Sequence, residues 1–163
     1  MRYAYQATDQ LEEGDIRHLK QIICASFLAI KVVSAFGEEE PTESKFITPD
    51  QLVWTDNPLR PGAQMAVIEG DPKKPGPLIL RLRFPADFSV PPHWHLAAER
   101  FTVLSGSMLE GIGEDGDMSK AKLLTAGSVG IFRAKTPHYV FTKEPIVLQV
   151  HTAGPLQTFP VKP

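Results

Sequence analysis

The sequence predicts one all-β domain, a closed antiparallel barrel or sandwich, preceded by an N-terminal extension. Nine short strand-like segments follow one another between residues 64 and 152, and no helix-length pattern interrupts them. The chain has 163 residues, which suffice for one domain with a real core. Its 15 prolines and scattered glycines favour many short elements joined by turns.

The predicted strands alternate apolar and polar residues or are rich in β-branched and aromatic residues. They cover residues 64–69, 77–84, 91–95, 99–105, 107–112, 119–124, 128–133, 138–143 and 146–152. Turn residues such as Pro75-Gly76 and Gly106 separate them. Before the first strand, Thr48-Pro49-Asp50 combines a helix N-cap with a proline in the first turn, which predicts one short helical turn.

The N-terminal segment, residues 1–37, has two interpretations. An apolar run at residues 22–30 follows Arg17, His18 and Lys20, and small residues follow at 33–37, as in a cleaved secretory signal. The protein would then be periplasmic or secreted. Alternatively, the segment is an amphipathic helix of a cytoplasmic protein, packed on the domain or on a second subunit. We expect residues 38–49 to be an acidic linker and residues 50–163 to form the β-domain.

Composition excludes several classes of function. The net charge is −2 and no basic run appears, which argues against a nucleic-acid partner. The single cysteine, Cys24, excludes an intramolecular disulfide and a cysteine-based zinc knuckle. No apolar stretch approaches the roughly 20 residues of a membrane-spanning helix.

A pattern of histidines and a glutamate predicts a metal site. His93 and His95 lie two residues apart in a predicted strand, so they point to the same face. Glu99 can join them from the next strand, and His138, about forty residues later, can supply a third imidazole. Imidazoles and a carboxylate that converge on one point bind divalent metals, and these ligand types admit Mn, Fe, Ni, Cu, Co or Zn.

The spacing around the first two histidines resembles a motif of the cupin superfamily, G-x5-H-x-H-x3,4-E-x6-G. Here Asp87 occupies the first glycine position, and His93, His95, Glu99 and Gly106 occupy the others at matching intervals. Only the first position departs from the motif. Aspartate tolerates a left-handed turn better than most residues do, so we expect the turn to be kept.

A second stretch is similar to the other cupin motif, G-x5-P-x-G-x2-H-x3-N. Gly127 and His138 lie at the matching separation. Arg133, Lys135 and Thr142 replace the proline, glycine and asparagine. These positions shape turns and strand ends in the family, so the loop that leads into His138 is expected to differ while the ligand position is kept.

The resemblance covers roughly residues 50–160 and has consequences for fold and function. It implies a cupin-type jelly-roll β-barrel, also called a double-stranded β-helix, a metal held by the four predicted ligands, and a homodimer. The favoured function is that of a small metal-dependent enzyme acting on a small oxygen-rich anion or a phenolic or enediol compound, of dioxygenase, decarboxylase or isomerase type. The alternative is a non-catalytic protein that binds a small ligand at the same site.

Several other residues are candidates for the substrate pocket. Phe101 shares the face of Glu99 and is expected to line the barrel. Gln149 and His151 share one face of the last strand, which is either the pocket wall or a solvated face. Arg81 is expected to face solvent or, alternatively, to reach an anion at the barrel mouth. For Glu110 a role in proton transfer at the rim is a weak alternative, and the sequence singles out no acid–base residue.

Overall fold

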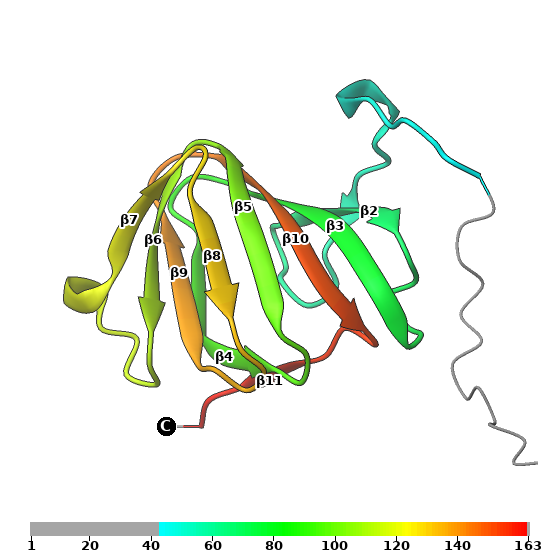
Figure 1. Ribbon diagram of the computed structural model, residues 1–163. Coiled ribbons are helices and arrows are strands. Elements are labelled where there is room, and N and C mark those ends of the chain that lie inside the picture. The colour runs from blue at the N-terminus through cyan, green and yellow to red at the C-terminus, as the bar shows by residue number, and fades with distance from the viewer. Residues whose placement is uncertain (1–42, 163) are drawn as a thin grey trace, which may run out of the picture. The chain divides into compact units, whose positions relative to one another are not determined.

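The computed structural model describes residues 43–162 and confirms the all-β prediction. Two antiparallel sheets face each other, and from β3 onward most connections carry the chain from one sheet to the other (Figure 1). This is the jelly-roll arrangement. The predicted N-terminal segment, residues 1–37, and the first part of the linker lie outside the described residues. Within the described part of the chain, no helix is long and apolar enough to cross a membrane.

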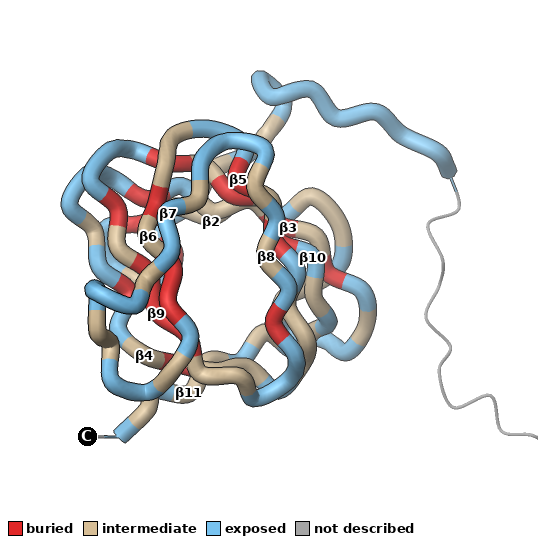
Figure 2. The backbone as a smooth tube through the Cα atoms, turned by 60° about the vertical axis from the view of Figure 1, so that its left-hand side comes forward, coloured by how far each residue is buried: buried red, intermediate tan, exposed pale blue. Residues whose placement is uncertain are grey.

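The six-stranded sheet has the order β1-β2-β3-β10-β5-β8, and the five-stranded sheet has the order β11-β4-β9-β6-β7. The strands are β1 (Thr55–Asp56), β2 (Gln64–Glu69), β3 (Gly76–Phe84), β4 (Ser89–His95), β5 (Glu99–Ser105), β6 (Ser107–Ile112), β7 (Lys122–Thr125), β8 (Val129–Phe132), β9 (His138–Thr142), β10 (Ile146–Gly154) and β11 (Thr158–Pro160). Viewed along the barrel, the two sheets surround a common interior (Figure 2).

Strands β2 to β10 correspond one by one to the nine predicted segments. The segment predicted at 119–124 begins later, as β7, because the 3-10 turn η2 (Met118–Lys120) precedes it. Asp117 caps that turn by accepting a hydrogen bond from the Ser119 backbone N–H at 2.9 Å. The predicted helical turn is the 3-10 turn η1 (Pro49–Gln51). The short strands β1 and β11 were not predicted.

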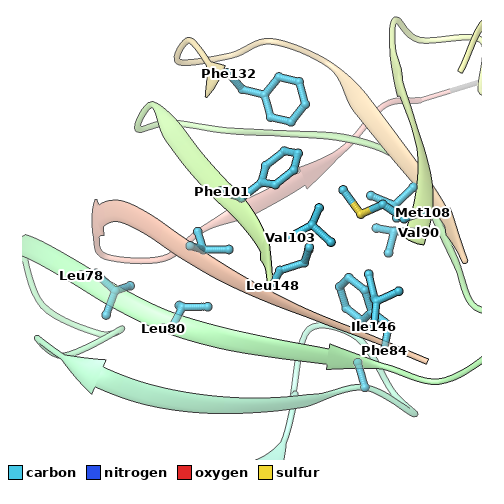
Figure 3. Packing of buried hydrophobic residues seen from close by; sticks show 13 residues of the cluster. Leu78, Leu80, Phe84, Val90, Phe101, Val103, Met108, Phe132, Ile146 and Leu148 are labelled. Carbon is cyan, nitrogen blue, oxygen red and sulfur yellow. The ribbon is translucent and has the colours of Figure 1, made fainter. Parts of the chain in front are cut away.

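The core consists of inward-facing apolar side chains from both sheets (Figure 3). On β10, the buried residues Ile146, Leu148 and Val150 alternate with more exposed neighbours. Phe101 and Val103 do the same on β5. Each such side chain contributes roughly 1.5–3 kcal/mol through burial, so this layer holds the two sheets together.

Both glycine positions that the motifs lack have the left-handed backbone that favours glycine. Asp87 has φ of 54°, as the sequence analysis expected, and Lys135 has φ of 62°. The loop before His138 therefore keeps the backbone conformation that a glycine would favour. The Lys135 N–H donates a hydrogen bond to the carbonyl of His95 at 2.8 Å, which ties this loop to the end of β4.

Thr142, at the asparagine position of the second motif, connects β9 to the turn before β4. Its fully buried hydroxyl donates to the Pro85 carbonyl at 2.7 Å and accepts from the Phe88 N–H at 3.1 Å. Its own backbone N–H donates to the Phe88 carbonyl at 2.9 Å. A single threonine side chain thus fixes the turn that carries Asp87.

We predict that Thr142→Val lowers the free energy of unfolding by about 2 kcal/mol, because the part-buried Pro85 carbonyl and Phe88 N–H both lose their partner. Denaturant unfolding of the purified variants measures this. Thr125→Val is the matched control, since Thr125 is exposed on β7, and it should stay within about 0.5 kcal/mol of the parent. Equal midpoints for the two variants would contradict the role given to Thr142.

Candidate metal centre

A bulge in β4 sets the positions of the site histidines. The register of β4 against β9 shifts between Val90 and His93, at two prolines that cannot donate to the ladder. In a regular strand, residues three positions apart point to opposite faces. Because of the shift, Val90 and His93 are nevertheless both buried. His93 then lies opposite His138 in the ladder. Strict alternation would have turned one of the two side chains outward.

The structure brings the three predicted histidines together. The ring centroids are 4.3 Å apart for His93 and His138, 5.0 Å for His93 and His95, and 5.3 Å for His95 and His138. One nitrogen of each ring lies within 4.8 Å of a nitrogen of the other two. Three buried histidines can therefore bind one metal ion.

Hydrogen bonds from the histidine Nδ1 atoms to backbone carbonyls determine which nitrogen faces the site. Each Nδ1 lies close to a carbonyl oxygen, which can only accept, so the proton of the neutral ring resides on Nδ1. The pairs are His93 Nδ1 with Pro91 O at 2.9 Å, His95 Nδ1 with Gln157 O at 2.9 Å, and His138 Nδ1 with Thr136 O at 3.0 Å. The lone pairs of all three Nε2 atoms are thus free for a metal.

Packing supports two of these rings. The Phe132 ring stacks on the His138 ring with centroids 4.2 Å apart. On the outer side, Trp94 stacks on Phe159 of β11 at 4.3 Å. That contact holds β11 against β4 and so fixes the segment that offers the Gln157 carbonyl to His95.

Glu99 approaches the histidines from the other sheet, at the start of β5. Its Oε2 is 3.4 Å from Nε2 of His95, and the two side chains are 15% and 11% exposed. Two ligand atoms that bind one ion at right angles, each about 2.1 Å from it, lie about 3 Å apart. The distance between Glu99 Oε2 and His95 Nε2 is close to this value. Glu99 is not part of the tight group that the three histidines form, and its place in the coordination shell remains a prediction. Burial raises the pKa of Glu99, while His95 and Arg60 counteract this rise.

The histidines are electrostatically suited to a cation. Burial, followed by repulsion from His138 and Arg60, lowers the pKa of His93 from 6.5 to about 3. Burial is also the main cause that lowers the pKa of His138 to about 4. Both rings are therefore neutral at neutral pH, which is the form that binds metal.

The histidine cluster opens into a cavity of about 70 Å³ inside the barrel. Its walls are mainly apolar and include Phe101, as predicted, with Leu80, Val140 and Leu148. This space suits a compact ligand next to the metal position. Glu99 and the three histidines all line the cavity.

Gln149, His151 and Arg81, the other candidates for the substrate pocket, lie on the outer face, which for Arg81 is the expected position and for the other two is one of the two alternatives. Leu148 and Val150 of β10 face the core, so Gln149 between them and His151 beyond point outward. Arg81 Nε donates to Gln149 Oε1 at 3.2 Å, and Gln149 Nε2 lies 3.0 Å from His151 Nε2. These residues form a polar row on the outer face of the six-stranded sheet and do not line the cavity.

The cavity also contains two ionisable residues outside the predicted ligand set: Glu110, which the sequence offered only as a weak candidate for proton transfer at the rim, and Arg60, which it did not single out. Glu110 on β6 is 8% exposed, and its Oε1 has no hydrogen-bond partner in the described part of the chain. Burial and the nearby charge of Glu99 raise the pKa of Glu110 well above its ordinary value, which favours the neutral acid. Arg60, in the loop after β1, also lines the cavity.

Alternation along its strand would have strengthened the case for Glu110, because it shares the buried face of Met108. No pattern in the sequence identified Arg60, since its loop has no periodicity that would indicate a direction.

Comparison with known proteins supports the fold. A search of protein-family profiles finds no match, and a search of curated proteins finds none either. Solved structures match well in shape. The polyketide cyclase RemF from Streptomyces resistomycificus aligns with a TM-score of 0.61 at 16% identity, over 74% of this chain and 87% of RemF.

Two further structures share the architecture. A protein with a double-stranded β-helix domain from Klebsiella pneumoniae has a TM-score of 0.56 at 18% identity, over 74% of this chain and all of that one (100%). An RmlC-like cupin from Shewanella frigidimarina has a TM-score of 0.54 at 15% identity, over 68% and 91%. The comparisons confirm the predicted cupin-type fold.

We predict that His138→Ala lowers metal affinity by more than roughly 100-fold, because it removes a direct ligand. Loss of a residue that only hydrogen-bonds to a ligand typically costs about 10- to 100-fold. Elemental analysis after equilibration with one equivalent of metal at neutral pH measures the occupancy. His151→Ala is the control, since His151 lies on the outer face, and it should retain the parent occupancy. Full occupancy in His138→Ala would contradict the assignment.

The lowered histidine pKa values also predict how the stability of the metal-free protein depends on pH. Both residues titrate near 6.5 in the unfolded chain, but His93 titrates at about 3 and His138 at about 4 in the folded one. Between these values the unfolded chain binds more protons, so stability falls as the pH is lowered through this window.

Removing one such histidine should flatten this dependence. Each contributes about 1.4 kcal/mol per pH unit near pH 5. For metal-free His93→Leu, the slope of the unfolding free energy against pH should therefore be smaller than the parent's slope by about 1.4 kcal/mol per pH unit. Denaturant unfolding from pH 4.5 to 5.5 measures both slopes. Parallel curves for parent and variant would count against a neutral, buried His93.

Proposed function

We propose that this protein is a metal-dependent enzyme that acts on a small oxygen-rich compound, by a reaction of dioxygenase, decarboxylase or isomerase type. One observation carries the proposal: the cavity that contains the three histidines also contains Glu110, a buried carboxyl group whose Oε1 has no hydrogen-bond partner among residues 43–162. A metal alone does not define a reaction. A metal next to a side chain that can donate or accept a proton is the combination that metal-dependent catalysis requires.

The residues that line the cavity would have different roles in the reaction. His93, His95 and His138 would hold the ion through their Nε2 atoms, with Glu99 as fourth ligand. When bound, the ion supplies Lewis-acid stabilisation of a developing oxyanion or a platform for dioxygen, and the donor set admits Mn, Fe, Ni, Cu, Co or Zn. Glu110 would donate a proton to the ligand or remove one from it. The apolar walls would exclude water and strengthen these electrostatic interactions.

The alternative is a binding protein that captures a small ligand without converting it. Such a protein needs no acid–base group, and an unpartnered buried carboxyl group costs stability. Glu110 therefore favours the enzyme. The cupin-type fold does not decide between the two functions, because one fold supports many activities. The homodimer and the periplasmic or secreted location remain proposals that rest on the resemblance and on the signal-like segment.

The test is a turnover assay on the metal-loaded protein with a panel of compact hydroxy and oxo acids, catechols and enediols, with products identified by mass spectrometry. We expect metal-dependent turnover of at least one compound. Glu110→Gln should reduce it by about 10²- to 10⁴-fold, because the amide cannot exchange the proton. Metal content should not change, since Glu110 is not a predicted ligand. Binding without turnover across the panel would support the binding protein instead.

A further inference from the structure

Arg60 lies on one wall of the cavity and is held there by a compact loop. The loop joins β1 to β2, and its two ends are connected by a hydrogen bond from Asn57 N to Ala63 O at 2.9 Å. Inside it, Arg60 N donates to Asn57 O at 3.1 Å and Ala63 N donates to Arg60 O at 2.9 Å. The buried Asn57 side chain accepts from Leu59 N at 2.9 Å. The backbone of Arg60 is thus fixed before any ligand arrives.

The guanidinium of Arg60 carries a charge that the described residues do not neutralise. It is half-buried, and its Nη1 donates to the carbonyl of the neighbouring Leu59 at 2.8 Å. No carboxylate in the described part of the chain lies within the 4.0 Å that defines an ion pair with it. Its charge nevertheless acts on the site, because it opposes the rise that burial causes in the pKa of Glu99 and adds to the lowering of the pKa of His93 and His138.

A simple sum of charges shows what this cavity attracts. A divalent ion brings two positive charges, an ionised Glu99 removes one, and Arg60 adds one. The buried histidines are neutral and Glu110 counts as the neutral acid, so the loaded cavity carries about two net positive charges between apolar walls. Unpaired charge in such surroundings is costly, and an anionic ligand would relieve it.

We propose that Arg60 and the metal together bind the carboxylate of a compact acid that carries a second oxygen on the adjacent carbon. The planar guanidinium matches a carboxylate in two parallel hydrogen bonds, and the adjacent oxygen lets the same ligand reach the metal. The cavity of about 70 Å³ has room for a compact ligand. This inference rests on the proposed function and narrows its substrate class from oxygen-rich compounds in general to hydroxy and oxo carboxylates.

Glycolate and glycolamide test this assignment, because they have nearly the same shape and differ in charge. Isothermal titration of both into the full-length, zinc-loaded protein gives their affinities. We expect the parent to prefer glycolate and Arg60→Gln to weaken glycolate binding by about 10- to 100-fold. Glycolamide binding should change less than about twofold, and the zinc content should not change.

Two further variants distinguish the effect of the two parallel guanidinium donors from the effect of positive charge alone. Arg60→Lys keeps the charge but loses the two parallel donors, so we expect an intermediate loss of glycolate affinity. Arg81→Gln removes a positive charge from the outer face of the same barrel, and glycolate should bind it as it binds the parent. A loss in Arg81→Gln equal to that in Arg60→Gln would overturn the assignment in favour of general charge.

The remaining outcomes are also decisive. Unchanged glycolate affinity in Arg60→Gln with full zinc content would overturn the role of Arg60 and leave the metal-dependent enzyme intact. Inorganic phosphate that binds more tightly than glycolate, and depends more strongly on Arg60, would overturn the carboxylate class. Failure of the parent to bind zinc or any other divalent metal would overturn this inference and the proposed function together.

Discussion

The site depends on three hydrogen bonds from histidine Nδ1 atoms to backbone carbonyls. Without them the imidazole rings could rotate or carry their proton on the nitrogen that faces the cavity. Each carbonyl comes from an irregular part of the barrel: Pro91 from the β4 bulge, Thr136 from the loop with the left-handed Lys135, and Gln157 from the turn before β11. The irregular segments of the fold therefore serve to orient the ligands.

The two sheets contribute different chemistry to one cavity. The five-stranded sheet supplies the three histidines and Glu110, whereas the six-stranded sheet supplies Glu99. A cation bound between them would connect the sheets across the barrel, and it would reverse the cost of burying Glu99, since it favours the ionised carboxylate. In the metal-free site, burial disfavours protonated histidines and an ionised Glu99. The neutral histidines that result are the form that binds a metal ion.

The sequence predicted the parts of this structure that local patterns determine. Turn residues and alternation located β2 to β10, and the motif spacing identified the three histidines that the structure brings together. Alternation alone could not say which face of β10 is inward, so Gln149 and His151 remained open and prove to face outward. Arg60 was missed because its position depends on how a non-periodic loop closes on a distant strand. Such contacts arise from the tertiary fold and leave no periodic signal in the sequence.

We infer that the Nε2 atoms of the three histidines form a single metal position. A crystal structure of the protein loaded with manganese or zinc, with data collected at the metal absorption edge, tests it directly. We expect one anomalous peak per chain, about 2.0–2.2 Å from Nε2 of His93, His95 and His138 and from a carboxylate oxygen of Glu99. A peak bound through Nδ1, or one outside the barrel cavity, would contradict it.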